Sequence, residues 1–246
     1  MKKITTSLSL LLLLVATGAQ AQFLGWQGDW RVGLMSNANY QLSTPKVHLG
    51  DYITKESIET GLCYGYGLYV GMQKDMGNSD WAWGLDGIAF FAPADWRADF
   101  KSIHFPFEKY SYYMTQFQFT GLFQAHAAYF LGHSLQAQAG IGPFAQLILQ
   151  QTDLVNIYNI NGLITYSVAE DVKNSMAGTI GAAASLGLTY YIANNFFVKG
   201  DFNYYLPFLK KDAYSNPILS DKHYLISYAE DGYKAVSFNL IIGVLW

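Results

Sequence analysis

Charged residues are scarce in this chain of 246 residues, where Asp, Glu, Lys and Arg together make up only 13%. Soluble globular domains usually carry roughly 25% of such residues. So few charges, with a formal net charge of −3, argue against a nucleic-acid-binding protein and against intrinsic disorder. The single cysteine, Cys63, excludes a disulfide within one chain.

The chain also lacks the short motifs that would point to a bound group. It contains no Cys/His spacing typical of a metal site, no glycine-rich phosphate loop and no basic patch. The sequence therefore predicts no metal, no cofactor and no nucleic-acid partner. What it does contain is 17% aromatic residues and 23 glycines, without long apolar helical runs, and this composition favours β-structure.

The N-terminus has the three parts of a secretory signal peptide. Met1-Lys2-Lys3 is basic, Leu8–Val15 is apolar, and Ala19-Gln20-Ala21 is a small-residue cleavage site. The apolar run is too short to cross a bilayer as a helix. We expect residues 1–21 to be removed and residues 22–246 to form one outer-membrane β-barrel domain.

Eight later segments alternate between apolar side chains and polar or small ones, which is the period of a β-strand. In the clearest segment, Leu68 and Val70 share one face with aromatic residues, opposite a face rich in glycine. The segments cover approximately residues 30–42, 61–73, 81–91, 113–129, 135–150, 176–190, 196–206 and 236–246. Each is near or above the roughly 9–11 residues that a tilted membrane strand needs. The pattern predicts an all-β fold: a transmembrane antiparallel up-and-down β-barrel of eight strands. Leu68, Val70, Phe119, Leu186 and Leu240 are expected to face hydrocarbon.

The connections between these segments alternate in length. Long connections are expected at about 43–59, 92–111, 151–174 and 207–232, and short ones at about 74–80, 131–134 and 192–195. Long loops on the outside and tight turns on the periplasmic side are typical of bacterial outer-membrane barrels. Both chain ends are then periplasmic.

Membrane helices are the first alternative, because residues 111–152 and 176–198 contain no charge. In the first run, however, glutamines recur on one parity, at positions 116, 118, 124, 136, 138 and 146. A lipid-facing helix would expose several of them to hydrocarbon, whereas a strand hides them all inside a barrel. A soluble sandwich is the second alternative. It would bury its apolar face and cover the other with charge, and here that other face is Gly, Gln, Ser, Thr and Asn.

Two stretches resemble the PorT-like and OmpX/OmpA-like eight-stranded barrel families of Gram-negative bacteria. One is the Ala-Gly-Ile-Gly-Pro-Phe stretch at residues 139–144, which is similar to a motif of PorT-like barrels. The other is the final strand, whose alternating residues resemble the C-terminal signal read by the barrel-insertion machinery: Phe238, Leu240, Ile242, Val244 and Trp246. The resemblance implies a location in the cell outer membrane, contact with its lipid and lipopolysaccharide, and insertion by that machinery.

Few ionisable residues occupy the positions that are predicted to face the barrel interior: Arg31, Asp86, His126, Lys199 and Asp201. The set can nearly neutralise itself, and buried charge is tolerated only when it is paired. An internal ion-pair plug is the favoured interpretation, because eight strands leave a lumen that side chains fill. The alternative is a gate or a path for protons or ions. Asp201 is expected to be the nearest anion of both Lys199 and Arg31.

Two function classes remain open. The favoured one is a non-enzymatic barrel with a structural, adhesion or accessory role through its extracellular loops. The other is a lipid-modifying enzyme, a lipid A deacylase or acyltransferase, with candidate residues His104, His223, Ser227 and Glu230. No recognisable spacing supports that second class, and eight strands are too few for a wide porin channel.

Two loop segments resemble each other and end in acidic pairs. Leu-Ile-Thr-Tyr at 163–166 precedes Glu170 and Asp171, and Leu-Ile-Ser-Tyr at 225–228 precedes Glu230 and Asp231. These four acids could form a rim site for Ca²⁺ or Mg²⁺ shared with lipopolysaccharide phosphates, since such cations take carboxylate oxygens. The more common situation, solvated acids on an exposed rim, is the favoured interpretation.

Overall fold

The computed structural model describes residues 29–42, 53–77, 79–102, 109–172, 178–193, 195–211 and 234–245. The strands in these ranges are β1(Asp29–Gln41), β2(Ile53–Thr60), β3(Leu62–Asp75), β4(Trp81–Ser102), β5(Lys109–Phe130), β6(Leu135–Tyr158), β7(Ile164–Val172), β8(Gly178–Ala193), β9(Phe196–Lys211) and β10(Ala235–Leu245). The described residues include no helix with the length and apolar character to cross a membrane. The uncharged runs lie in β5, β6 and β8, so the helical alternative is wrong.

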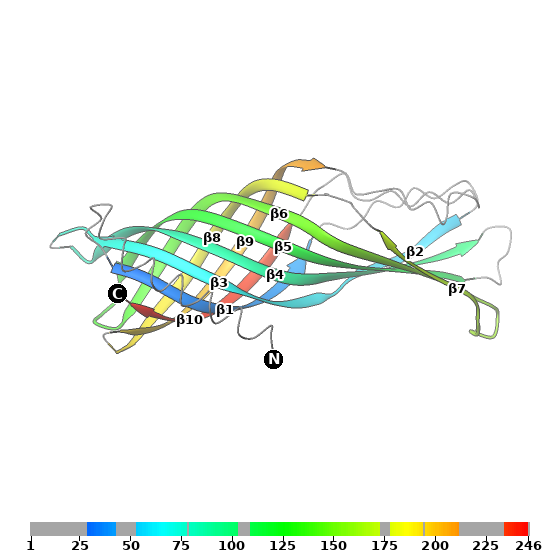
Figure 1. Ribbon diagram of the computed structural model, residues 1–246, viewed down its shortest axis with the longest axis horizontal. Coiled ribbons are helices and arrows are strands. Elements are labelled where there is room, and N and C mark those ends of the chain that lie inside the picture. Colours follow the sequence, from blue (N-terminus) through cyan, green and yellow to red (C-terminus); the bar gives the residue numbers. More distant parts are fainter. Residues whose placement is uncertain are drawn as a thin grey trace.

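Eight of the strands close into a ring, in the order β1-β3-β4-β5-β6-β8-β9-β10 (Figure 1). Every strand pairs antiparallel with the next one in the ring. The first and last strands pair along the whole of β10, from the pair Arg31 and Leu245 to the pair Gln41 and Ala235. The predicted eight-stranded antiparallel up-and-down barrel is confirmed.

The expected long connections are partly wrong, because several of these residues are in strands. β4, β5 and β6 are 22, 22 and 24 residues long and continue far past the barrel. β2 pairs with the far part of β4, and β7 with the far part of β6. We call this extension, formed by β2, β7 and residues 92–102, 109–118 and 150–158, the outer sheet; in Figure 1 it projects from one end of the barrel. Its outward positions include Asp95, Arg97 and Asp99, which alternate with buried apolar residues, so the strand period continues through part of the predicted loop at 92–111.

The outside of the barrel is an apolar belt. Alternation directs one parity of every ring strand outward, and the exposed side chains there include Leu34, Ile141, Leu186, Phe202 and Ile242. Leu186 keeps 65% of its surface exposed. A soluble protein rarely leaves so continuous an apolar surface in water.

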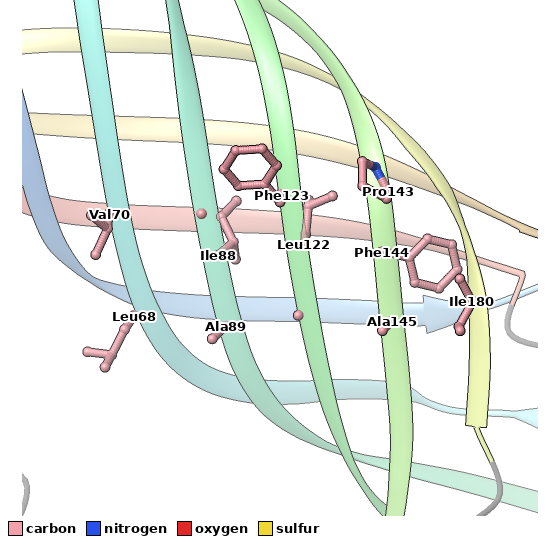
Figure 2. Close-up of a pocket in the computed structure, with 12 residues that line it drawn as sticks. Leu68, Val70, Ile88, Ala89, Leu122, Phe123, Pro143, Phe144, Ala145 and Ile180 are labelled. Carbon is pink, nitrogen blue, oxygen red and sulfur yellow. The ribbon is translucent and has the colours of Figure 1, made fainter. Parts of the chain in front are cut away.

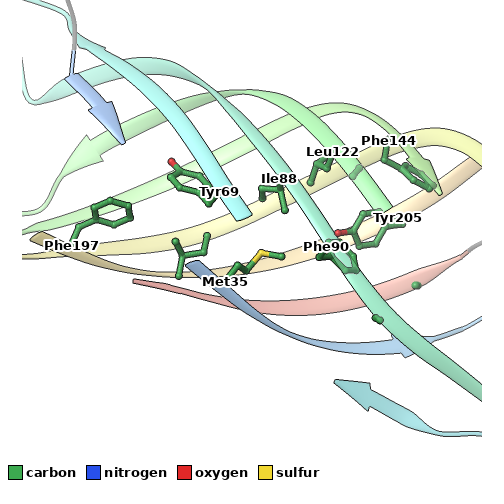
Figure 3. Close-up of a cluster of buried hydrophobic side chains, with 12 residues drawn as sticks. Met35, Tyr69, Ile88, Phe90, Leu122, Phe144, Phe197 and Tyr205 are labelled. Carbon is green, nitrogen blue, oxygen red and sulfur yellow. The ribbon is translucent and has the colours of Figure 1, made fainter. Parts of the chain in front are cut away.

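The inside of the barrel is filled by side chains. Figure 3 shows apolar residues from strands around the ring that meet in the lumen, among them Phe90, Leu122, Phe144 and Tyr205. The rings of Phe144 and Tyr205 meet edge to face, with centroids 5.1 Å apart. This apolar layer occupies the space that a channel would need.

Candidate functional site

Asp86, on β4, is the centre of a buried group of ionisable side chains. Its Oδ2 accepts a hydrogen bond from Nζ of Lys199 at 2.7 Å, and its Oδ1 accepts one from the hydroxyl of Tyr69 at 2.6 Å. Nδ1 of His126 lies 3.2 Å from Oδ2. The side chains of Asp86, Lys199 and His126 are all fully buried. A buried carboxylate such as that of Asp86 is tolerated because a cation, Lys199, and the hydrogen-bond donor Tyr69 surround it.

Asp201 is the second acid of the group. Its Oδ2 lies 3.1 Å from Nζ of Lys199, so this ammonium bridges the two carboxylates. Nε2 of Gln138 also lies between them, at 3.4 Å from one oxygen of each acid. Lys199 further lies 4.5 Å from the centroid of the Tyr69 ring, a favourable cation–π distance.

Arg31 is buried but belongs to a neighbouring polar group rather than to Asp201. Its Nη2 donates to the hydroxyl of Tyr191 and to Oε1 of Gln136, the latter at 3.4 Å. Its guanidinium also lies 5.5 Å from the centroid of the Tyr191 ring. The expectation that Asp201 serves both Lys199 and Arg31 is therefore wrong for Arg31, because the partners that its guanidinium contacts are Tyr191 and Gln136.

Glycines make room for the two carboxylates. A Cβ at Gly71 would lie 2.6 Å from Oδ1 of Asp86, and one at Gly187 would lie 2.0 Å from Oδ1 of Asp201. Gly71 and Gly187 are the direct cross-strand partners of these acids. The glycines on the inward faces of β3 and β8 therefore set how closely the acids approach the neighbouring strand.

Replacement of Gly187 by Val is expected to destabilise the barrel by about 1–3 kcal/mol, because the new side chain overlaps Asp201 and overpacks the lumen. Gly200→Val is the matched control, since a Cβ there meets no atom closer than the Phe238 ring at 3.5 Å. Urea unfolding in detergent micelles measures both variants. Equal midpoints for Gly187→Val and the wild type would contradict the close packing of Asp201.

The sequence placed Gln136 and Gln138 inside the barrel, but it did not assign them, Tyr69 or Tyr191 to this polar group. Selecting only ionisable residues at inward positions found the charges and not their donors. The signal was present in β3, where Tyr69 is the one bulky aromatic side chain on an inward face made mostly of glycine.

The proposed rim acids are only partly described. Glu170 and Asp171 lie in β7, where their backbones pair with Asp153 and Thr152. Glu230 and Asp231 lie outside the described residues, as do the enzyme candidates His104, His223 and Ser227 and the expected signal peptide, residues 1–21. Within the described ranges, no three His, Cys, Asp or Glu side chains are grouped to hold a metal ion.

The proposed insertion signal lies in β10. Phe238, Leu240 and Ile242 project outward and are exposed. Val244 follows on the same strand and pairs with Val32 of β1. Trp246 lies outside the described residues. This arrangement gives the last strand one apolar face directed away from the barrel.

Comparison with known proteins adds little beyond the fold. No protein-family model and no curated protein matches the chain. Among solved structures, the attachment invasion locus protein Ail of Yersinia pestis is 9% identical, with 90% of this chain and 100% of that chain covered and a TM-score of 0.36. The outer membrane protein OprG from Pseudomonas aeruginosa is 13% identical, with 89% and 96% covered and a TM-score of 0.40. Neither similarity bears on what this chain does, and membership of the PorT-like family stays a prediction.

Proposed function

We propose that the chain is an integral, non-enzymatic protein of the cell outer membrane and that its signal peptide, residues 1–21, is removed by cleavage. The observation that carries this proposal is the inversion of polarity across the barrel wall. Side chains that face out, such as Leu186 and Ile242, are apolar and exposed, whereas Asp86, Lys199 and Asp201 are buried inside. A closed barrel also satisfies its backbone hydrogen bonds without water, as hydrocarbon requires.

The outer sheet is the part that would act outside the membrane. β4, β5 and β6 exceed by far the roughly 9–11 residues needed to cross a bilayer, so their far halves stand clear of it. On the outward face, Nη2 of Arg97 lies 3.1 Å from Oδ2 of Asp99, and the guanidinium lies 5.3 Å from the centroid of the Tyr113 ring. The hydrogen bond that Nε of Arg97 donates to Oδ1 of Asp99 raises the pKa of Arg97, which stays charged. This ordered polar face suits a structural, adhesion or accessory role.

The edges of the outer sheet are poor sites for strand pairing. β2 has the sequence Ile-Thr-Lys-Glu-Ser-Ile-Glu-Thr, and β7 ends in Ala-Glu-Asp-Val. Charged residues on edge strands discourage another strand from adding to a sheet. A partner is therefore expected to bind the face of the outer sheet rather than its edges.

Three partners belong to this proposal: outer-membrane lipid, lipopolysaccharide and the barrel-insertion machinery. The apolar belt supports contact with lipid, and the outward apolar face of β10 supports recognition by the machinery. A site for Ca²⁺ or Mg²⁺ at the acids Glu170, Asp171, Glu230 and Asp231 remains a proposal of the same kind.

Epitope insertion tests the location and the orientation together. A tag inserted at Asn161, in the exposed turn between β6 and β7, should be stained by antibody on intact cells. A tag at Gly132, in the turn between β5 and β6 at the opposite end of the barrel, should be stained only after the outer membrane is permeabilised. Staining of the Gly132 tag on intact cells would reverse the orientation, and staining of neither tag after permeabilisation of a well-expressed protein would contradict the location.

Purified wild-type protein in a planar bilayer is expected to give no stable conductance. The reason is that the buried ionisable side chains around Asp86 and the apolar layer of Phe90, Leu122 and Phe144 both fill the lumen. Single-channel recording measures this directly. Regular conductance steps from the wild type would favour a gate or an ion path over a plug.

A further inference from the structure

A shallow apolar hollow lies in the outer surface of the barrel, across β3, β4, β5, β6 and β8, with a volume of about 590 Å³. Its floor is low because outward positions on three neighbouring strands carry Gly87, Ala89, Gly121 and Ala145. Ala89 pairs with Gly121 across β4 and β5, and Gly121 pairs with Ala145 across β5 and β6. The small residues therefore form one continuous depression rather than separate gaps.

Larger apolar side chains surround this floor. Figure 2 shows Leu68 and Val70 on β3 at one side and Ile180 on β8 at the other, with the Phe123 ring on β5 between them. None of the twelve lining residues has a polar side chain. A ligand that needs hydrogen bonds for recognition has nothing to bind here, whereas a hydrocarbon chain needs none.

The glycines of the floor are not required by the packing of the barrel. A Cβ at Gly121 would meet no atom closer than 4.0 Å, and one at Gly87 none closer than 3.6 Å. By contrast, a Cβ at the inward Gly142 would lie 2.0 Å from the carbonyl oxygen of Phe123. Glycine inside a strand is less favourable than Ala, and it often marks a place where a ligand approaches the backbone closely. The floor thus keeps open a space that ordinary side chains could fill.

An aromatic row fixes the depth of the hollow in the membrane. Tyr66, Phe91 and Phe119 occupy the next outward positions toward the outer sheet, directly beyond Ala89 and Gly121. The rings of Phe91 and Phe119 have centroids 5.0 Å apart. Aromatic girdles lie at the two membrane interfaces of such barrels. The hollow is therefore on the hydrocarbon side of the outer girdle, at the level of the outer-leaflet acyl chains.

We propose that this hollow seats one acyl chain of lipid A, the acylated part of outer-leaflet lipopolysaccharide; the inference rests on the proposed outer-membrane location. An acyl chain lying on Gly121 and Ala145 would gain the van der Waals contacts that the open floor otherwise lacks. A second copy of the barrel fits less well. Phe123 and Ile180 line the hollow and stay 54% and 55% exposed, so the convex wall of a second barrel would meet these side chains before it reached the floor.

Native mass spectrometry of the barrel, released from a mild detergent with purified lipid A added, tests the proposal. The wild type should retain one lipid A molecule. Ala145→Leu fills the floor and should lower this retention at least tenfold. Ala139→Leu is the matched control, because it makes the same change on the same face of β6 outside the hollow, and it should retain lipid A as the wild type does. A parallel sample with phosphatidylethanolamine should show weaker retention.

Equal retention of lipid A by the wild type and Ala145→Leu would overturn the proposal. So would stronger retention of phosphatidylethanolamine, or a wild-type dimer that Ala145→Leu abolishes. Co-flotation of each protein with liposomes separates this result from the proposed location. A barrel that floats but shows no selective retention loses only the lipid site, whereas a barrel that does not insert loses the proposed location itself.

Discussion

Replacement of Asp86 by Ala is expected to destabilise the barrel by about 3–5 kcal/mol, because removing one partner of a buried ion pair leaves the other charge uncompensated. Asp86 accepts hydrogen bonds from Lys199 and Tyr69 and lies 3.2 Å from His126, so its loss affects three buried groups at once. The urea midpoint of unfolding in detergent measures the change in stability, and planar-bilayer recording of the same sample shows whether the lumen has opened.

Asp201→Ala is the matched comparison for Asp86→Ala. Asp201 contacts Lys199 at 3.1 Å and Gln138 at 3.4 Å, and Lys199 keeps Asp86 when Asp201 is removed. We therefore expect a smaller loss of stability for Asp201→Ala. The triple variant Asp86→Leu, Lys199→Met and Asp201→Asn should recover much of the lost stability, because it removes the ammonium together with both carboxylates that contact it. If Asp86→Ala leaves the urea midpoint unchanged and makes the barrel conduct, the buried charges act as a gate and not as a plug. If the midpoint is unchanged and the barrel does not conduct, both interpretations are wrong.

Introduction of Arg at Leu186 is expected to cost about 2–4 kcal/mol, the usual range for a cation near the bilayer midplane of a barrel. Leu186 lies on the outward face of β8 and is 65% exposed, so the new charge would enter hydrocarbon. Urea unfolding in lipid vesicles measures the effect, since the penalty depends on a surrounding bilayer.

Thr115→Arg is the control for Leu186→Arg. Thr115 lies on the outward face of β5 in the outer sheet, four residues beyond Phe119 of the aromatic row, and its cross-strand partner on β4 is Asp95. An Arg there stays in water beside a carboxylate and should change the free energy of unfolding by less than about 1 kcal/mol. Equal losses at the two positions would contradict the boundary between the apolar belt and the outer sheet.

The barrel could be predicted from the sequence because its strands alternate between apolar and polar residues with a period of two. A residue on a ring strand faces either lipid or lumen, so polarity at alternate positions specifies strand, face and register together. Inward glutamines such as Gln118 and Gln138 removed the helical alternative on their own, and the structure buries both of them. The charged residues Arg31, Asp86, Lys199 and Asp201 follow the same parity and lie in the lumen.

The contacts among the buried charged side chains could not be predicted, because alternation along a strand gives no distances between strands. Parity places Arg31 and Asp201 in the same lumen, but only the strand register shows that Lys199 lies between the two acids while Arg31 meets Gln136 and Tyr191. The outer sheet was missed for another reason. Residues 92–99 keep the period of two, but here the apolar residues Ala94, Trp96 and Ala98 are buried and the charged ones face out. This polarity is the reverse of that of the barrel wall, and the segment was predicted to be a loop.

The seam between β1 and β10 has a consequence for how the barrel folds. Its pairs, from Arg31 with Leu245 to Gln41 with Ala235, join the segments that are most distant along the chain. All other neighbours in the ring are hairpin partners, or nearly so, and can form early with a small loss of chain entropy. The seam has the highest contact order in the molecule and should form last, after β10 has been synthesised. Until then β1 and β10 are both unpaired edges, so the incomplete barrel must be protected from aggregation before it reaches the bilayer.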